Sequence, residues 1–578
     1  MHTTRQLTTE LHHSPPIDTL PNELLLDIFR FCVGQSLDHI APVYLGTFEI
    51  DFEGNCEDEW PRIDTAQLIS LTHVCVRWRF LLLDCPEFWT CIDGHNIAQF
   101  TAFVQRSKSL PLSLAVCYED TELTREREGS EVVVYRPDVA ALVSPLLARL
   151  KTVDIVVEDY PPTWIFQEYP PLLEVFNFCV HEGEIKFTSE TPLLFNTQVL
   201  PLTALAISGL SGPDLPLNEL PNLTHLYLSM CSFDDVPPEN ILGLLSRTPN
   251  LEVFHFDCVS VPEAEDPDEL PLVSLPQLQG LSFSYGDMGP MFYLVPYLEF
   301  PDTVLIRCHV ASPPTEGRRA IHCIPLTYIP LLCTSTVLEL RQRMDRVILV
   351  LACPTSYDYT LLCTFTDTAT DWPGEWLPEL DTHLPLEGLT RVRVDLPFQT
   401  APVLAALLPH MYALEELAVD EPDLPSLGVL VAALAPADLG ASVPCPALRA
   451  LTLTSCSAGG GGARVDAADA AALAEDLIRV LALRAAVGRR VARVVVQPMR
   501  RSEQPGEEWQ DARFSRVRGV FESAGVEDHV ESFEVLGPDA DVFGGWLEEA
   551  GWLLVIESDY WNYAWLSAGE TWDVSDMD

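Results

Sequence analysis

The sequence predicts a chain of the mixed α+β or α/β class, with a short helical module, a horseshoe-shaped solenoid that has a parallel inner sheet, and a C-terminal cap. Three observations predict this fold. Helical apolar spacing occurs near the N-terminus, a strand-like apolar motif recurs every 21 to 29 residues from residue 150, and five tryptophans lie within the last 33 residues. With 578 residues, the chain is long enough for several such units.

Composition limits the classes of partner. Lysine and arginine number 34 against 85 aspartate and glutamate, which gives a formal net charge of −51. A field of this sign repels phosphate backbones and anionic lipids, so we expect neither nucleic acid nor a membrane as a partner. Residues 1–16 lack the features of a signal peptide and are expected to be disordered, and no stretch has the ~18 apolar residues that span a bilayer.

The 16 cysteines are spread along the chain without a CxxC spacing. This pattern argues against a zinc knuckle, and reduced thiols in a cytosolic or nuclear protein explain it most simply. No metal or cofactor is expected. No metalloprotease, hydrolase or paired-carboxylate motif with supporting context occurs, so the sequence nominates no catalytic residue.

Two helical patterns lie near the N-terminus. Within residues 20–31, Pro21 and Glu23 suit the first turn of a helix. Two apolar pairs then stack at i, i+4, Leu24 with Ile28 and Leu25 with Phe29. The second pattern predicts one helix that ends before Pro86, with steps of three and four along Leu68, Leu71, Cys75, Trp78 and Leu82.

Three motifs in this region together resemble the F-box: Leu20-Pro21-x-Glu23-Leu24-Leu25-x-x-Ile28-Phe29, Leu71-x-x-Val74-Cys75-x-x-Trp78 and Pro86-x-x-Trp89. The resemblance covers residues 17–92, about one eighth of the chain. It departs from the family at about residues 34–64, where a long acidic insert replaces a short link. Doubling a loop costs only ~0.6 kcal/mol, so the expected fold is unchanged. The alternative is two amphipathic core helices of an unrelated domain.

The resemblance implies a three-helix unit that packs against the C-terminal helices of a Skp-type adaptor of a ubiquitin ligase. Carried onto the matching positions, it implicates eight adaptor-binding residues, which the sequence does not divide between the adaptor surface and the core of the unit. They are Leu20, Pro21, Leu24, Leu25, Ile28, Phe29, Val74 and Trp78.

A second motif, L-x-x-L-x-L, recurs from about residue 147 and resembles the strand signature of leucine-rich repeats. Its best copies start at Leu223 and Leu448 and lead to Cys231 and Cys456, where that repeat places Asn or Cys. Alternate side chains of each strand would point into a shared core, and the others would line a surface. Eight weaker copies start at Leu150, Leu173, Leu202, Leu251, Leu278, Leu389, Leu414 and Val491.

The repeats are expected to cover residues 93–500, with an irregular stretch at about residues 284–388, where no clean period is kept. A generic α/β domain with leucine-rich strands is the alternative. An alanine-rich helix is expected from about Asp466 to Ala486. Residues 501–578 are expected to cap the solenoid, or alternatively to form an aromatic binding surface, through Trp546, Trp552, Trp561, Trp565 and Trp572.

These features favour a non-catalytic substrate-recognition subunit of an SCF-type ubiquitin ligase. The F-box would dock on a Skp-type adaptor and through it on a cullin, and the repeats would bind an unknown protein target. The acidic repeats suggest that this target has a basic surface. Two alternatives remain: a repeat scaffold that binds an adaptor or other protein without directing ubiquitination, and a hydrolase within residues 284–388.

Overall fold

The computed structural model describes most of the helical module and of the solenoid. Residues 38–64 of the expected acidic insert, the five C-terminal tryptophans and residues 1–16 lie outside the described residues, and so do the expectations made for them, whereas residues 34–37 belong to a helix. The described residues are 17, 20–37, 65–94, 97–118, 124–127, 130–133, 143–157, 169–180, 195, 198–209, 218–229, 231, 237–257, 259, 261, 270–284, 293–301, 303–310, 335–343, 346–352, 359–366, 380, 384, 386–396, 400–421, 423–436, 442–456, 467–500 and 511–537.

Three helices form the N-terminal unit: α1 (Asn22–Leu37), α2 (Ala66–Val74) and α3 (Val76–Asp84). The single helix expected through Leu68 to Leu82 is therefore wrong. Cys75 interrupts it with extended backbone angles, φ −154° and ψ 169°, and its side chain caps α3 by accepting from the Trp78 N–H. The apolar stripe is continuous in sequence because both helices bury residues toward α1, so periodicity alone does not reveal the break.

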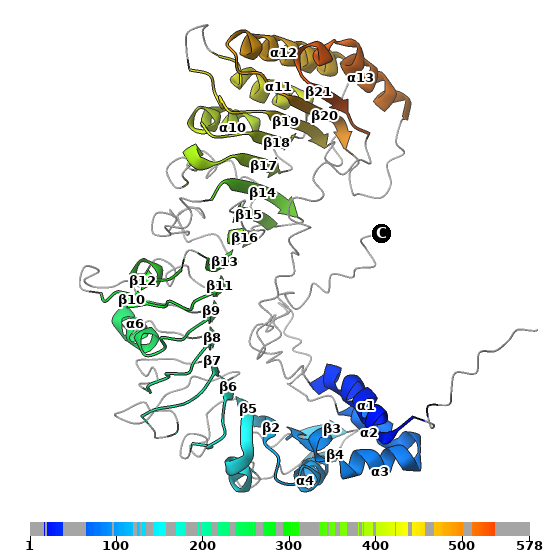
Figure 1. The fold of residues 1–578 in the computed structure, drawn as a ribbon, viewed down its shortest axis with the longest axis vertical. Coiled ribbons are helices and arrows are strands. Elements are labelled where there is room, and N and C mark those ends of the chain that lie inside the picture. Colours follow the sequence, from blue (N-terminus) through cyan, green and yellow to red (C-terminus); the bar gives the residue numbers. More distant parts are fainter. Residues whose placement is uncertain are drawn as a thin grey trace, which may run out of the picture.

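One sheet runs through the whole solenoid (Figure 1), and 17 of the described strands belong to it. Along the chain its strands are β1 (Cys91–Asp93), β2 (Leu112–Tyr118), β5 (Leu150–Val157), β6 (Val175–Val180), β7 (Ala204–Ser208), β8 (His225–Ser229), β9 (Val253–Asp257), β11 (Gly280–Ser284), β13 (Leu305–Val310), β14 (Val337–Arg343), β15 (Arg346–Ala352), β16 (Tyr359–Thr366), β17 (Arg391–Asp395), β18 (Glu416–Glu421), β19 (Ala450–Cys456), β20 (Arg493–Arg500) and β21 (Ser532–Val535). The mixed α/β class and the large parallel sheet predicted from the sequence are confirmed.

The recurring apolar motif accounts for ten of these strands. In every copy the second and third apolar residues lie on a strand and are buried, as Leu226 and Leu228 are on β8. The first apolar residue is also buried and precedes the strand, as Leu223 does, except in the copy at Leu150, which is the first residue of β5. Backbone bonds between successive turns hold the strands in register, because the N–H of Thr224 donates to the Thr203 carbonyl and that of Glu252 donates to the Thr224 carbonyl.

An antiparallel meander lies within the stretch that was expected to be irregular. β14 and β16 both pair antiparallel with β15, while β13 pairs parallel with β16 and β14 pairs parallel with β17. The chain therefore crosses from β13 to β14, runs back through β15 to β16, and leaves room for the parallel array to resume at β17. Strands without the repeat spacing thus keep the sheet continuous.

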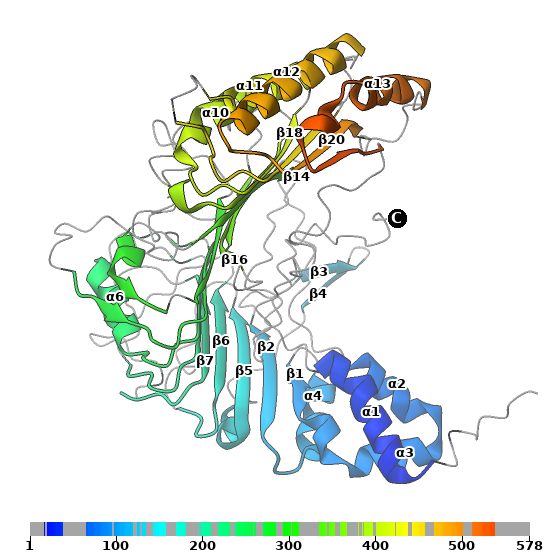
Figure 2. The ribbon, with the colours of Figure 1, turned by 45° about the horizontal axis from the view of Figure 1, so that its top comes forward.

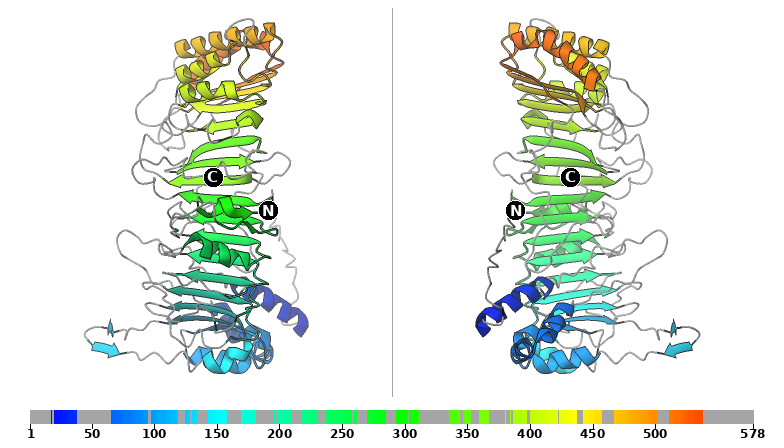
Figure 3. Two further views of the ribbon diagram at one scale, coloured as in Figure 1. Left: turned by 90° about the vertical axis from the view of Figure 1, so that its left-hand side faces the viewer. Right: turned by 90° about the vertical axis from the view of Figure 1, so that its right-hand side faces the viewer.

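The remaining helices lie on the outer, convex side of the sheet, as α6, α10, α11 and α12 show in Figures 1 and 2. The strands run across the long axis of the solenoid, one after another along its length (Figure 3). The alanine-rich helix expected from about Asp466 is confirmed as α12. The helices are α4 (Ile97–Arg106), α6 (Pro238–Ser246), α10 (Ala401–Leu407), α11 (Leu424–Ala433), α12 (Ala467–Ala486) and α13 (Asp511–Ser523), with short 3-10 turns η2 (Pro86–Trp89), η3 (Ser144–Arg149), η7 (Val295–Tyr297), η12 (Leu386–Gly388), η13 (Leu408–His410) and η14 (Val526–His529).

The described part of the expected cap extends the array. After β20, helix α13 leads through η14 to β21, which pairs parallel with β20. Val517 and Phe521 of α13 are buried in the core that the convex helices share. Two small pairings complete the structure, a parallel one between β10 (Val273–Ser274) and β12 (Leu298–Glu299) and an antiparallel one between β3 (Thr124–Arg127) and β4 (Ser130–Val133). Among the described residues no helix is long and apolar enough to cross a membrane.

Candidate functional site

The three N-terminal helices share a small apolar core. Phe29 of α1 packs edge to face on Trp78 of α3, with ring centroids 4.8 Å apart and an interplanar angle of 61°. Leu25, Leu68 and Leu82 are also fully or almost fully buried here. Edge-to-face rings contribute roughly 0.5–1.5 kcal/mol beyond the area that they bury. The helices are therefore fixed relative to one another by a few large side chains.

Polar contacts hold the start of α3 against the start of α1. The Arg77 Nη2 atom donates to the Leu20 carbonyl at 2.6 Å and to Asn22 Oδ1 at 2.7 Å. The Arg79 Nε atom donates to the Thr72 carbonyl at 2.9 Å and so satisfies one of the last carbonyls of α2. These two arginines flank Trp78 in the sequence, and each one donates a hydrogen bond to a backbone carbonyl near a helix end.

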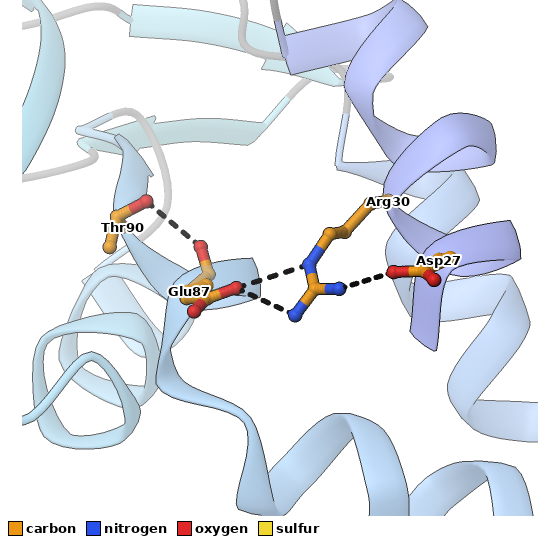
Figure 4. Close-up of polar contacts among 4 residues, drawn as sticks. All are labelled: Asp27, Arg30, Glu87 and Thr90. Carbon is orange, nitrogen blue, oxygen red and sulfur yellow. Dashed lines mark hydrogen bonds and ion pairs between the residues drawn. The ribbon is translucent and has the colours of Figure 1, made fainter. Parts of the chain in front are cut away.

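A surface network joins α1 to the turn that follows α3 (Figure 4). The Arg30 guanidinium lies 2.6 Å from Asp27 Oδ1 and 3.1 Å from Glu87 Oε2, and Thr90 Oγ1 donates to the Glu87 carbonyl. Burial by itself lowers the pKa of Arg30, but the two carboxylates outweigh this effect and raise it. All three charged side chains are about half exposed, so each pair contributes only about 0–1 kcal/mol.

Large apolar side chains are exposed on this unit in unusual number. Of the thirteen exposed large hydrophobic residues in the described part of the chain, eight lie between residues 17 and 80. Phe31 and Phe80 are each 70% exposed and Val76 is 67% exposed. A soluble protein seldom exposes such side chains together except where a partner covers them. We call this set the apolar patch: Ile17, Leu24, Ile28, Phe31, Ile69, Val74, Val76 and Phe80.

The patch follows two stripes. On α1, Leu24, Ile28 and Phe31 are separated by four and three residues, so they share one face of the helix. At the start of α3, Val76 and Phe80 are four residues apart and share another face. Because Arg77 donates to the Leu20 carbonyl and to Asn22, the N-terminal ends of α1 and α3 are close together.

The eight residues implicated by the F-box resemblance divide between the inside and the outside of the unit. Leu25, Phe29 and Trp78 are buried, and Leu20 is half-buried. Pro21, Leu24, Ile28 and Val74 are exposed. The sequence missed five members of the patch, Ile17, Phe31, Ile69, Val76 and Phe80. The spacing of Phe31 from Ile28 and of Phe80 from Val76 was the available signal, but it does not tell an exposed stripe from a buried one.

The helical unit continues directly into the solenoid. Trp89 of η2 is buried, donates its Nε1 hydrogen to the Leu82 carbonyl at 2.8 Å, and packs edge to face on Phe103 of α4. The Arg106 guanidinium lies 4.3 Å from the centroid of the Trp89 ring. β1 begins two residues later and pairs parallel with β2. The apolar core of the unit is thus continuous with that of the first repeat.

The concave face of the sheet forms a second candidate surface. Residues between the buried apolar positions of each strand project from this face and align by register across neighbouring strands. All members of the central row are buried. We call it the concave row: Ala115, Asp154, Asn177, Ala206, Tyr227, His255, Ser282 and Arg307 on β2 to β13, and Glu339, Arg393 and Ala418 on β14 to β18.

Polar and aromatic side chains interact along this row. The rings of Tyr227 and His255 stack with centroids 4.4 Å apart, and Glu339 Oε1 lies 3.2 Å from Arg393 Nη1. Burial raises the pKa of Asp154 to about 7. Burial and the positive charge of Arg307 lower the pKa of His255 to about 3, so this imidazole is neutral. Side chains of the row therefore already interact with one another through aromatic and polar contacts.

No model of a known protein family matches the sequence, and no curated protein matches it.

Proposed function

We propose that this chain is the substrate-recognition subunit of an SCF-type ubiquitin ligase. Its N-terminal unit would dock on a Skp-type adaptor, and through it on a cullin, while the repeats would bind a protein target. The single observation that carries the proposal is the apolar patch on a three-helix unit whose sequence resembles the F-box. A unit of this size has little interior, and partners commonly cover the apolar side chains that such a unit exposes.

The position of the patch suits the proposed docking. Leu24, Ile28 and Phe31 lie on a different face of α1 from Leu25 and Phe29, which fill the core. An adaptor helix laid along this face could bury three side chains without disturbing the unit. Burying a large apolar side chain contributes roughly 1.5–3 kcal/mol, so a few patch residues suffice for a stable complex.

The join at Trp89 suits the role of a receptor. The unit and the first repeat share a core, so a target held by the solenoid would keep a fixed orientation relative to the adaptor. Such a subunit needs no catalytic residues, because holding the target near the transferred ubiquitin raises its effective concentration.

Affinity capture of the full chain from cells, followed by mass spectrometry, tests the proposal. We expect a Skp-type adaptor and a cullin to be captured together, and the double variant Phe31→Ala/Phe80→Ala to lose both. The control Leu272→Ala/Tyr412→Ala removes two exposed apolar side chains from the solenoid and should keep both. Capture of the adaptor without a cullin would favour the scaffold, and capture of neither by the unchanged chain would contradict the proposal.

A further inference from the structure

The C-terminal part of the solenoid is rich in arginine, although the chain as a whole is strongly acidic. Residues 449–518 contain 12 arginines and eight acidic residues, whereas the rest of the chain contains 22 basic and 77 acidic residues. Four arginines of this stretch are exposed and lie close together in the structure. We call them the arginine edge: Arg449, Arg489, Arg490 and Arg493.

The arginine edge occupies two neighbouring turns, which precede β19 and β20 at the C-terminal end of the solenoid (Figure 1). The Arg449 carbonyl accepts from the N–H of Ala492 at 2.8 Å and from that of Arg493 at 2.9 Å, so the two turns are in direct contact. Arg489 and Arg490 belong to the second turn, which follows α12. The four side chains therefore start from backbone segments that touch one another.

The end of α12 and one buried arginine fix both turns. Gly488 follows the helix in the left-handed conformation, with φ 74°, and the Arg489 N–H donates to the Arg484 carbonyl at 2.8 Å, which closes the helix end. The Arg484 side chain is completely buried, and its Nη2 atom donates at 2.8 Å to the Cys445 carbonyl, in the turn before β19. A single residue thus holds both turns, and such preorganisation reduces the conformational entropy that is lost on binding.

Most of the arginine edge is unpaired within the described part of the chain. Arg493 Nη2 lies 3.6 Å from Glu534 Oε2, and these side chains are 58% and 44% exposed. Arg449, Arg489 and Arg490 form no ion pair and no side-chain hydrogen bond with the described residues. Like charges on adjacent turns repel one another, so an anionic partner that bridges them would relieve this repulsion.

We propose that the arginine edge binds a short acidic segment of a partner protein. A guanidinium can donate two parallel hydrogen bonds to one carboxylate, so several guanidinium groups on adjacent turns suit several carboxylates along a peptide. This surface goes beyond the proposed adaptor docking and does not depend on it. It also differs in sign from the acidic remainder of the repeats, and it therefore adds a separate recognition surface.

The charges on either side of the edge limit the length of the ligand. Glu415 lies in the turn before β18 and Glu531 in the turn before β21, and both are exposed. β18 and β21 are three strand spacings apart, which is roughly 14 Å or about four extended residues. A nucleic acid or an anionic membrane would extend over these glutamates and over the acidic remainder of the chain. A short acidic peptide is therefore the occupant that the charges favour.

Fluorescence anisotropy of a labelled hexaglutamate peptide with the purified full chain tests the proposal. We expect binding at low salt that weakens as salt is added, and roughly fivefold weaker binding or less for Arg489→Gln/Arg490→Gln. The control Lys151→Gln/Arg479→Gln removes the same charge from exposed positions outside the edge and should bind like the unchanged chain. Equal loss in the two double variants would overturn the proposal, and so would the absence of binding by the unchanged chain at low salt.

Two further measurements distinguish other occupants. We expect neither a short DNA duplex nor phosphatidylserine vesicles to displace the hexaglutamate peptide at equal charge concentration. Displacement by either one, together with its loss of binding in Arg489→Gln/Arg490→Gln, would assign the edge to that polyanion and overturn the proposal. Sedimentation velocity should give the same oligomeric state for this variant and the unchanged chain. Self-association that disappears in the variant would assign the edge to a second copy of the chain and overturn the proposal as well.

Discussion

Arg77 at the start of α3 lies against the residue that opens the F-box-like motif: its Nη2 atom is 2.6 Å from the backbone oxygen of Leu20. The same nitrogen is 2.7 Å from Asn22 Oδ1. This contact links the Leu20-Pro21 segment to α3, although 57 residues separate Arg77 from Leu20 in the chain. It fixes the entry into α1 relative to the start of α3.

Replacing Arg77 with alanine should destabilise the unit by about 1–2 kcal/mol, because it removes charge-assisted hydrogen bonds from a partly buried site. Urea unfolding, followed by tryptophan fluorescence, measures the change. Arg77→Lys should recover only part of the loss, since an ammonium does not reproduce the planar fork of the guanidinium. Arg490→Ala, at an exposed position in the turn before β20, is the control. An Arg77→Ala variant as stable as this control would disprove the role given to the contact.

Trp89 and Trp78 offer a matched pair of substitutions. Both rings are buried, but Trp89 Nε1 donates to the Leu82 carbonyl, whereas Trp78 Nε1 has no hydrogen-bond partner in the described part of the chain. Trp89→Phe should therefore destabilise the protein by about 1 kcal/mol more than Trp78→Phe, which removes a buried N–H that is not satisfied.

Thermal unfolding of the two variants measures this difference. Trp89→Ala should cost much more, about 3–5 kcal/mol, because it leaves a cavity where the helical unit meets the first repeat. Equal losses for Trp89→Phe and Trp78→Phe would show that the bond to Leu82 contributes nothing.

Glu421 predicts a pH dependence of stability. Burial is the largest cause that raises the pKa of this carboxyl to about 7, against the opposing hydrogen bonds from the Thr400 hydroxyl and N–H. The folded state then binds a proton more tightly than the unfolded state does. The resulting stability is fully present below the ordinary glutamate pKa of ~4.3 and is lost as the pH rises to about 7.

Glu421→Gln keeps an oxygen that can accept from Thr400 but does not titrate. The free energy of unfolding of this variant should fall less between pH 4.5 and 7 than that of the unchanged protein, as urea titrations at several pH values would measure. Asp154 is predicted to contribute a slope of the same sign, since burial raises its pKa to about 7, so Asp154→Asn should flatten the remaining dependence. Identical slopes for the Glu421→Gln variant and the unchanged protein would refute the assignment.

Much of the solenoid could be predicted from its sequence, because each repeat adds one strand whose apolar residues must face the shared core. The spacing of Leu223, Leu226 and Leu228 is enough to place β8, and nine other copies work in the same way. The meander β14 to β16 could not be predicted in this way. Its antiparallel strands pair through the backbone and need no repeat spacing. The alternation of buried and exposed positions around Leu338 and Leu340 predicts a half-buried strand but does not predict its antiparallel pairing.

The candidate site was less predictable. A helical stripe has the same periodicity whether it faces a core or a partner, so the spacing of Leu25 and Phe29, which are buried, does not differ from that of Leu24 and Ile28, which are exposed. Only the packing of α2 and α3 against α1 separates the two sets. The turn at Cys75 was missed for a related reason, since the stripes of α2 and α3 join without a break in the sequence.

The central claim is that the apolar patch binds a Skp-type adaptor, and titration calorimetry of the purified full chain with a purified adaptor tests it most directly. We expect a one-to-one complex and, for Phe31→Ala/Phe80→Ala, an affinity at least tenfold weaker, which corresponds to about 1.4 kcal/mol or more. Leu272→Ala/Tyr412→Ala should bind like the unchanged chain. No binding by the unchanged chain, or equal affinity for the patch variant, would contradict the claim.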